Sequence, residues 1–390
     1  MVATRAYLDH NASAPLRESA RVAMIEALSA SNASSVHAEG RAARKIVEEA
    51  RRNVASLVNA DPAHVIFTSG ATESAATLLV SEWRMGRGAV RMSQLYVCEA
   101  DHPCLLGGGR FDSSAVTRLP VDSDGVLDLA FLRSALDAHD MEAGLPLVAV
   151  HLANNETGVI QPVERITEIV HAAGGVVILD AVQAVGRIPV DISAGYADYM
   201  ILSSHKIGGP KGVGAIVAAS DLMMPKPLIA GGGQEKGHRA GTENVPGIAG
   251  FGAAAREALA ELPLIDSVRE RRDSLEEHLL ASDSGVEIFG ARAQRLPNTT
   301  FFALPGMKAE TSQIAFDLAG VALSAGSACS SGKVGPSHVL KAMGFGDRAG
   351  ALRVSMGMAT TDDDIDLFRK AWAGILARRP KVMDGATKAA

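Results

Sequence analysis

Short apolar runs alternate with longer amphipathic segments through the first two thirds of the chain. The runs are rich in valine, isoleucine and leucine, which is typical of strands buried on both faces. Strands are therefore expected at residues 65–68, 94–97, 146–152, 176–179, 199–202 and 213–218. Helices are expected around them, at residues 17–30, 39–58, 71–84, after Pro103, at 162–173 and at 245–261. This alternation predicts an α/β domain whose mostly parallel, mixed sheet is covered by helices on both faces.

The pattern changes near residue 261, where a charged helix leads into a second set of elements. That helix is expected at 264–282, followed by strands near Glu287 and Thr299, a helix near Glu310, a strand at 352–355 and a helix at 362–377. We predict a large domain of residues 15–260 and a smaller α+β domain formed by residues 1–14 and 261–390. A stretch of small residues at about 324–335 is expected to be a loop of the smaller domain.

The overall composition excludes several classes of protein. The chain has 390 residues, 47% of them hydrophobic and only 4% aromatic, enough for a large aliphatic core. Its formal net charge is -6 and it has no long block of lysine and arginine, which argues against a nucleic acid partner. No run approaches the ~18 apolar residues of a membrane helix, and the start lacks an apolar signal core. We therefore expect a cytoplasmic protein without membrane contact.

The chain has three cysteines, Cys98, Cys104 and Cys329. They are too few, and odd in number, for a disulfide framework. Cys98 and Cys104 flank His102 at a spacing that suits part of a metal site, but no second ligand pair completes a tetrahedral set. Cys98 ends a strand and is expected in the core. No metal of the protein's own is predicted.

Lys206 follows the strand at 199–202 directly, in the sequence Ser-Ser-His-Lys. In open α/β sheets the strand ends point into the ligand crevice, so a lysine there suits the capture of a carbonyl group. A lone lysine is more often a solvated surface residue. The glycine-rich loop at 208–212 favours the site, because it lets the backbone close around a bound group.

Asp180 ends the strand before, where a lone aspartate is more often a turn former or helix cap. Taken with Lys206, it suggests pyridoxal phosphate. The lysine holds the aldehyde of this cofactor, and the carboxylate keeps the pyridine nitrogen protonated so that the ring accepts electrons. Gln183 is placed to donate to the phenolic oxygen of the ring.

A seat for the phosphate is expected at residues 68–73, where a strand, a glycine turn and the start of a helix follow one another. Free N–H groups at a helix start attract an anion, although such turns are mostly simple caps. The chain has no Walker A motif. Residues 344–349 fit the dinucleotide spacing but do not join a strand to a helix, so we interpret them as a loop.

Taken in order, these motifs resemble the cysteine desulfurases. These are class-V aminotransferase-like enzymes of the pyridoxal phosphate fold type I, and the long cysteine segment is similar to the mobile-loop branch that serves iron-sulfur cluster assembly. The resemblance covers nearly the whole chain. It is carried by residues 7–12, 32–37, 67–73, His102, 154–158, 180–183, 204–206, 239–244, 324–331 and Arg353.

The resemblance implies a role for each site residue. Lys206 forms the internal aldimine, Asp180 pairs with the pyridine nitrogen and Gln183 with the phenolic oxygen. His102 stacks on the ring and helps in proton transfer, while Asn155, a cofactor contact as well, binds the amino acid together with Arg353. The phosphate is held by Ala71, Thr72, Ser203 and His205, and by Thr242 from the second subunit of a homodimer.

Cys329 lies in a segment of small residues with Lys333 nearby, which suits an exposed and reactive thiol better than a core cysteine. In the family, the cysteine of this loop attacks the sulfur of L-cysteine, releases L-alanine and keeps a persulfide. The expected acceptor of that sulfur is an iron-sulfur scaffold or another acceptor protein. On a scaffold partner, Cys329 could transiently contact a cluster.

Two kinds of alternative remain. Within the enzymes, the chain could be a selenocysteine lyase or another class-V enzyme such as an aminotransferase, although transamination needs no nucleophilic thiol. From a different class, it could be a catalytically silent scaffold partner. Loss of Lys206, Asp180 or Cys329 would mark such a protein, and all three are present.

Overall fold

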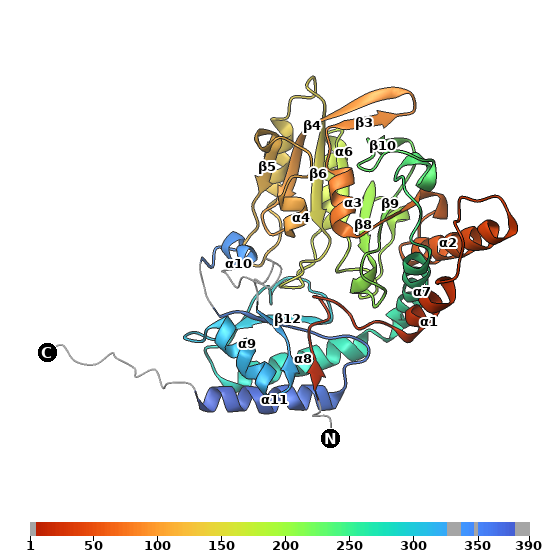
Figure 1. Ribbon diagram of the computed structural model, residues 1–390. Coiled ribbons are helices and arrows are strands. Elements are labelled where there is room, and N and C mark those ends of the chain that lie inside the picture. The colour runs from red at the N-terminus through yellow and green to blue at the C-terminus, as the bar shows by residue number, and fades with distance from the viewer. Residues whose placement is uncertain (1–4, 326–336, 347–349, 379–390) are drawn as a thin grey trace.

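The computed structural model describes residues 5–325, 337–346 and 350–378. A nine-stranded sheet fills the upper part of the molecule (Figure 1). Its strands follow the order β10-β3-β4-β6-β7-β8-β9-β2, and β5 pairs with β4 outside this path. Their bounds are β2 Val65–Thr68, β3 Glu82–Met85, β4 Gly88–Cys98, β5 Val116–Leu119, β6 Leu145–His151, β7 Val176–Asp180, β8 Tyr199–Ser203, β9 Gly214–Ala218 and β10 Met223–Pro225.

The parallel strands occupy the middle of this sheet. The pairs of β4 with β5 and β6, of β6 with β7 and of β7 with β8 are parallel, whereas both flanks pair antiparallel. The predicted mixed α/β sheet is therefore confirmed. Because parallel strands end at the same edge, Asp180 and the segment after Ser203 meet there.

The two faces of the sheet have separate cores, as the period of two in a strand requires. Val177, Leu179 and Met200 point to one core, and Ile178 and Ile201 to the other. The first core is covered by α1 Glu18–Ala27, α2 Ala38–Leu57, α5 Leu129–Asp137, α6 Val163–Ala172 and α7 Val245–Glu261. The second is covered by α3 Ala71–Leu78 and α4 Pro103–Leu106. Helices on both faces are thus confirmed.

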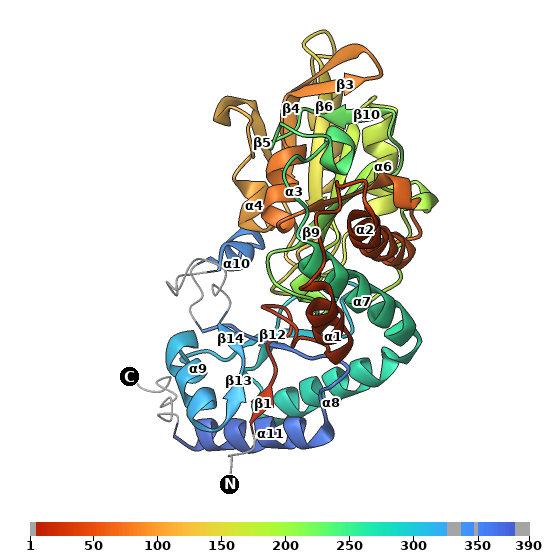
Figure 2. The same ribbon diagram turned by 45° about the vertical axis from the view of Figure 1, so that its right-hand side comes forward.

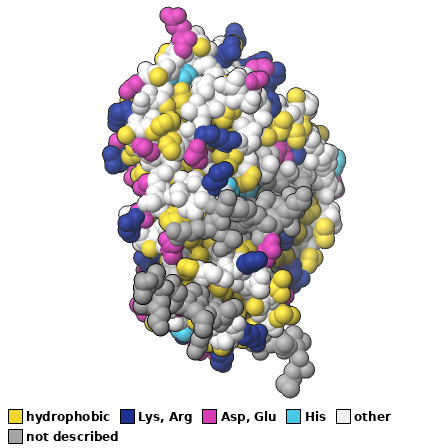
Figure 3. Space-filling view, turned by 90° about the vertical axis from the view of Figure 1, so that its left-hand side faces the viewer, with side chains coloured by type: hydrophobic (Ala, Val, Ile, Leu, Met, Phe, Trp, Pro, Cys, Tyr) yellow, Lys and Arg dark blue, Asp and Glu magenta, His cyan; other side chains and the backbone are white. Residues whose placement is uncertain are grey.

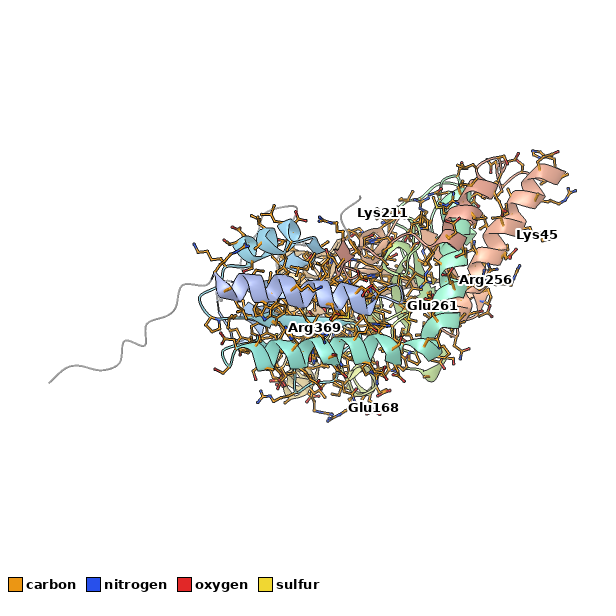
Figure 4. The ribbon with its side chains drawn as sticks, turned by 90° about the horizontal axis from the view of Figure 1, so that it is seen from below. Lys45, Glu168, Lys211, Arg256, Glu261 and Arg369 are labelled. Atoms are coloured by element: carbon orange, nitrogen blue, oxygen red, sulfur yellow. The ribbon has the colours of Figure 1, made fainter. Side chains whose placement is uncertain are left out.

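A smaller antiparallel sheet, β11-β12-β15-β14, lies in the lower part (Figure 2). Its strands are β11 Glu287–Ile288, β12 Thr299–Ala303, β14 Ser324–Ala325 and β15 Leu352–Ser355, and β1 Ala6–Tyr7 pairs with β13 Val321–Ala322 beside it. The helices there are α8 Asp266–Ser282, α9 Ala309–Leu318 and α11 Asp362–Ala377. Figure 4 shows α8 and α11 side by side, where Arg369 donates to Ser274 Oγ at 2.8 Å.

The prediction of one helix over residues 71–84 is wrong beyond Leu78. Residues Glu82–Met85 form β3, which turns at Gly86 (φ 58°) into the early start of β4. Trp83 is buried while Glu82 and Arg84 are exposed, a period of two that packing against the sheet selects. The strands β5, β10, β13 and β14 and the helices α5 and α10 (His338–Ala342) were not predicted either, and the expected loop at about 324–335 begins with strand β14.

Helix α10, His338–Ala342, belongs by sequence to the predicted smaller domain but packs on the larger one. Val339, Leu340 and Met343 join the core beneath the large sheet, and Figures 1 and 2 both show α10 next to α4. The division at residue 260 stays a prediction. Short 3-10 helices complete the structure: η1 Pro62–His64, η2 Ser113–Ala115, η3 Ile192–Ala194, η4 Ser204–Lys206, η5 Gln234–Gly237 and η6 Leu262–Leu264.

The surface carries both signs of charge. On the face shown in Figure 3, basic and acidic side chains are interspersed among apolar ones. Within the described part of the chain, no helix combines the length and the apolar character needed to cross a membrane.

Candidate active site

A cavity of about 520 Å³ lies at the edge of the large sheet where β7 and β8 end. It brings together elements from the whole upper part of the molecule, namely the start of α3, the start of α4 and the segment after β8. Nine of the predicted site residues line its wall: Ala71, Thr72, His102, Asn155, Asp180, Gln183, Ser203, His205 and Lys206.

Lys206 ends η4 and extends its amine toward the N-terminal segment. Its Nζ donates to the carbonyl oxygens of Asn11 at 2.7 Å and Ala12 at 3.0 Å. Asn11 is fixed in turn, because its backbone N–H donates to Ser355 Oγ and its side-chain amide to Thr299 Oγ1, both at 2.9 Å. The amine is therefore held at a defined position in the cavity wall.

Asp180 supplies a buried carboxylate at the end of β7. It is 7% exposed, and its Oδ1 accepts the N–H of Val182 at 3.0 Å. Burial raises the pKa of this carboxyl to about 6, and the Val182 N–H opposes the rise. A positively charged ring nitrogen beside it would favour the ionised form, because opposite charges stabilise each other.

The start of α3 is built to receive an anion. Gly70 precedes it with φ 156°, and no side chain of the described residues caps the helix, so the first backbone N–H groups stay available. A Cβ on Gly214 of β9 would lie 2.7 Å from the Gly70 Cα, so only glycine fits at that strand position. The nearby acid Glu73 is neutralised by Arg239, whose Nε donates to its Oε1 at 3.0 Å.

Two histidines of the wall are neutral. Burial, together with the charge of Lys206, lowers the pKa of His102 and of His205 to about 4. His102 Nδ1 accepts the backbone N–H of Cys104 at 3.2 Å, so the ring proton is on Nε2. His205 Nδ1 lies 3.2 Å from Ser13 Oγ.

His151, which also lines the wall, forms a buried pair with Asp101. Asp101 Oδ1 lies 2.6 Å from His151 Nδ1, and its Oδ2 accepts the Cys98 N–H at 2.8 Å. His151 Nε2 lies 3.1 Å from the Gln161 amide nitrogen, whose partner oxygen accepts the Leu127 N–H. The amide nitrogen must therefore donate to Nε2, so the proton of His151 is on Nδ1. Cys98, Asp101 and His151 could together face a cation, yet hydrogen bonds to one another and to the backbone already engage their polar atoms.

The residues of the wall fit pyridoxal phosphate. The amine of Lys206 suits the aldehyde, the carboxylate of Asp180 suits the ring nitrogen, and the uncapped start of α3 suits the phosphate. This fit rests on the chemistry of the three groups and on their convergence on one cavity.

Comparison with known proteins points the same way. Residues 6–368 match the family model described as aminotransferase class-V. The chain belongs to this family.

Relatives to which the chain is similar include proteins named cysteine desulfurase. The chain is 39% identical over 371 residues to a cysteine desulfurase of Cereibacter sphaeroides, covering 93% of each chain. It is 36% identical over 393 residues to a putative cysteine desulfurase of Bacillus subtilis, covering 96% of this chain and 99% of the other. A NifS-like protein from Rickettsia africae has the same fold, with a TM-score of 0.86 at 29% identity, covering 96% and 99% of the two chains.

Arg353, a predicted substrate residue, does not line the cavity itself but contacts its wall. It is 2% exposed; its Nη1 donates to the Asn155 carbonyl at 2.9 Å and its Nη2 to Asp9 Oδ1 at 2.7 Å. Its Nε has no hydrogen-bond partner among the described residues. An incoming carboxylate would therefore share the guanidinium with Asp9.

Like Arg353, the predicted site residue Thr242 is not among the residues that line this cavity. Thr242 lies in an exposed stretch before α7. Cys329 lies outside the described residues. On its two sides, Ser324 of β14 donates to Asp9 Oδ2 at 2.8 Å, and Ser337, which caps α10, donates to Glu156.

The sequence reasoning missed two buried charged residues of the site, Glu156 and Arg187. Glu156 is 1% exposed, and burial raises its pKa to about 7 against the opposing effects of Ser337 and Arg353. Arg187 contacts Gln183 and Lys206. Glu156 lies within the stretch 154–158 that carries the family resemblance, and Arg187 comes four residues after Gln183. Neither position has a local sequence pattern that distinguishes a buried charge from a surface charge.

Proposed function

We propose that this protein is a cysteine desulfurase, which uses pyridoxal phosphate to release sulfur from L-cysteine as a persulfide on Cys329 and forms L-alanine. The observation that supports it best is the convergence of Lys206, Asp180 and the uncapped start of α3 on one cavity. The class-V relatives named cysteine desulfurase support the choice of reaction.

The wall residues would hold the cofactor at three points. Lys206 would hold its aldehyde, Asp180 its ring nitrogen and Gln183 its phenolic oxygen. The phosphate would lie at the α3 start against Ala71, Thr72, Ser203 and His205. When bound, this cofactor supplies an electron sink for bonds at the α-carbon of an amino acid.

Lys206 is also the base that we assign to the α-proton, since its amine belongs to the cavity wall at the point assigned to the aldehyde of the cofactor. His102 offers its Nε2–H to the same space and stays neutral through the physiological range, because its pKa is lowered to about 4. Arg353 and Asn155 would receive the substrate carboxylate.

The sulfur step balances without an external oxidant. The Cys329 thiolate forms an S–S bond with the substrate sulfur while the substrate C–S bond breaks. The sulfur atoms are oxidised, the β-carbon is reduced, and it takes up the proton that the thiol gave. The other two cysteines are poor nucleophiles, because burial raises the pKa of Cys98 and of Cys104 well above the usual range.

We also propose a homodimer in which Thr242 contacts the phosphate of the partner subunit, a cytoplasmic location, and an iron-sulfur scaffold or another protein as the sulfur acceptor. The dimer proposal is supported by the place of Thr242, which is exposed and lies away from its own cavity. One buried oxygen of the adjacent Glu243 has no partner among the described residues.

The test compares three forms of the purified protein. The wild type should be yellow and should bleach on borohydride reduction. The reduced cofactor should then be found attached to Lys206. Cys329→Ala should keep the colour but lose alanine release and persulfide formation with L-cysteine. Cys98→Ala, which removes a core thiol, should keep both.

Each failure points to a different alternative. A colourless protein that cannot be reconstituted would contradict the cofactor, and normal turnover by Cys329→Ala would contradict the thiol's role. Faster alanine release from L-selenocysteine in both forms would favour a selenocysteine lyase. A coloured protein without turnover of either amino acid would favour a silent scaffold partner.

A further inference from the structure

A buried guanidinium, that of Arg187, lies directly behind the wall of the proposed cofactor cavity. Arg187 is 6% exposed and follows β7 at the end of the turn that carries Gln183. Its Nη1 donates to the Gln183 carbonyl at 2.6 Å and to the Gln183 Oε1 at 2.9 Å, and its Nη2 to the Lys206 carbonyl at 3.3 Å. Among the described residues, Arg187 therefore donates to two residues, both of the proposed site.

These bonds belong to a closed ring of hydrogen bonds. Gln183 Nε2 donates to the Asn11 carbonyl at 3.1 Å, and Lys206 Nζ donates to the same oxygen at 2.7 Å. Arg187 closes the ring, since it bonds to Gln183 on one side and to Lys206 on the other. A change at Arg187 therefore reaches both cofactor contacts.

The ring fixes which end of the Gln183 amide faces the cavity. An amide has one acceptor oxygen and two N–H donors. Arg187 is donor only and engages the oxygen, so the nitrogen takes the other side, where Asn11 uses one of its two donors. The second donor is then available for an acceptor in the cavity, such as a negatively charged oxygen.

The charge of Arg187 is not balanced locally. Within the described residues, no carboxylate lies at ion-pair distance from it, although several other buried arginines have one. Burial, assisted by the charge of Arg353, lowers its pKa to about 10, so it remains charged at neutral pH. A buried cation without a partner costs free energy, which the negative charge of a bound ligand would offset.

Other charges also act on this part of the wall, from several elements. Arg353 of β15 opposes Arg187, and Arg187 in turn acts on His10 and on His205. Lys206 acts on His102 and on Asp180, and Lys211 acts on His205. Asp101 and His151 also act on Asp180. Negative charge comes from Asp180, from Asp101 and from Asp9, which pairs with Arg353 and also acts on His10.

We propose that Arg187 is a positioning residue for the cofactor. It turns the Gln183 amide so that N–H faces the phenolic oxygen, and it supplies positive charge behind that oxygen. Arginine suits this role because its planar fork engages both Gln183 and Lys206, which the point charge of a lysine cannot do. The inference rests on the proposed function, since it needs pyridoxal phosphate in the cavity.

The test follows the visible absorbance of the cofactor-loaded protein against pH, in Arg187→Met, Arg187→Lys and a matched control, Arg272→Met. Arg272 is another buried arginine, 8% exposed, which donates to the Leu296 carbonyl in the lower part of the molecule. The readout is spectroscopic and needs no turnover.

We expect Arg187→Met to raise the pH midpoint of the absorbance change by about one unit, because a nearby cation disfavours the protonated, more positive form of the loaded site. Cofactor binding, measured by equilibrium dialysis, should weaken about tenfold, as when a charged hydrogen bond is lost. Arg187→Lys should shift the absorbance maximum but move the midpoint less. Arg272→Met should change neither property.

Two results would overturn the inference. One is an Arg187→Met protein that titrates and binds cofactor as the wild type does. The other is an equal shift in Arg272→Met, which would mean that losing any buried arginine has this effect. If Arg187→Met does not fold, the inference would be overturned by an Arg187→Lys protein whose absorbance maximum and cofactor affinity equal those of the wild type. A wild-type protein that never takes up colour would instead overturn the proposed function first, and this inference with it.

Discussion

Two buried arginines next to the large sheet bond to different kinds of partner. Arg51 of α2 forms a two-pronged ion pair with Glu235, at 2.7 and 2.8 Å, and its guanidinium lies 4.9 Å from the centre of the Phe67 ring. In the part of the chain that the structure describes, Arg187 bonds to carbonyl and amide oxygens of Gln183 and Lys206 and to no carboxylate. Both side chains are almost fully buried.

The difference separates a structural region from a ligand site. The Arg51 region balances its own charge, and Glu235 Oε2 also accepts the Phe67 N–H at 2.9 Å. The Arg187 region has donors and positive charge in excess, next to a cavity. A buried ion pair is costly to break, but its two charges balance each other. A buried charge without a counter-ion is tolerated where a bound ligand supplies the opposite charge.

The Arg51 region also holds a strained turn. Glu235 and Lys236 have φ of 46° and 56°, values that cost non-glycine residues about 1 kcal/mol or more each. The ion pair fixes this turn, which begins the stretch that leads to Thr242. The Arg51 region therefore holds the start of the stretch that carries Thr242, the residue of the proposed dimer contact.

The largest expected effect is on stability, from Glu235→Ala. This variant leaves the buried Arg51 with Glu48 as its ion-pair partner, whose Oε1 lies 3.2 Å from the Arg51 Nε, so the free energy of unfolding should fall by about 3 kcal/mol. Chemical denaturation of the protein, followed by circular dichroism, measures it.

A double variant, Arg51→Met with Glu235→Leu, is the control. Because it removes both charges, it should recover much of the lost stability. Equal stability of Glu235→Ala and wild type would mean that the ion pair does not hold this turn, and the contrast with Arg187 would be lost.

A smaller effect, from pH, belongs to the cavity side. Burial raises the pKa of Asp180 to about 6 and of Glu156 to about 7, above the ~4 of the unfolded chain. Between these values the folded protein keeps protons that the unfolded chain releases, so its stability without cofactor should fall as the pH rises from 4 to 7. Glu156→Gln should flatten this fall by about 1–3 kcal/mol in denaturant melts taken across the range.

The exposed Glu26 provides the comparison, because Glu26→Gln should leave the pH profile of stability unchanged. A Glu156→Gln protein with the wild-type slope would show that the buried carboxyl does not hold its proton at neutral pH. The same melts on cofactor-loaded protein should show a weaker slope, since the bound ring keeps Asp180 ionised.

The smallest effect concerns the link between the two regions. If Thr242 reaches the phosphate of a second subunit, Thr242→Val should weaken cofactor binding about tenfold, the value of one hydrogen bond to a charged group. Thr311→Val, at an exposed threonine of α9, should bind as the wild type does.

Mixed dimers test the direction of this contact. A Thr242→Val subunit paired with a Lys206→Ala subunit should bind cofactor at one site with wild-type affinity, because the intact Thr242 is supplied in trans. Weak binding in the mixed dimer would place the contact within one chain and remove the link.

The prediction of secondary structure succeeded where burial alone sets the pattern. The runs at β7 and β8 and the long helices α7 and α11 were located to within a few residues, since a strand buried on both faces and an amphipathic helix have distinct periods. It failed at β3, where Trp83 favours a strand only because the large sheet offers it an edge. The antiparallel direction of β9 likewise follows from pairing, which the sequence does not state.

The sequence by itself determined the kinds of groups at the candidate site. Asp180 and Lys206 follow continuous apolar strands, and parallel strands bring their ends to one edge, so local patterns sufficed to place an acid and an amine together. Only the tertiary structure decided their surroundings. The Asn11 carbonyl meets Lys206 across 195 residues, Arg353 is already paired with Asp9, and Arg187 has no carboxylate beside it in the described structure. These are facts of long-range packing, because what a buried charge bonds to depends on which distant backbone and side-chain atoms fold against it.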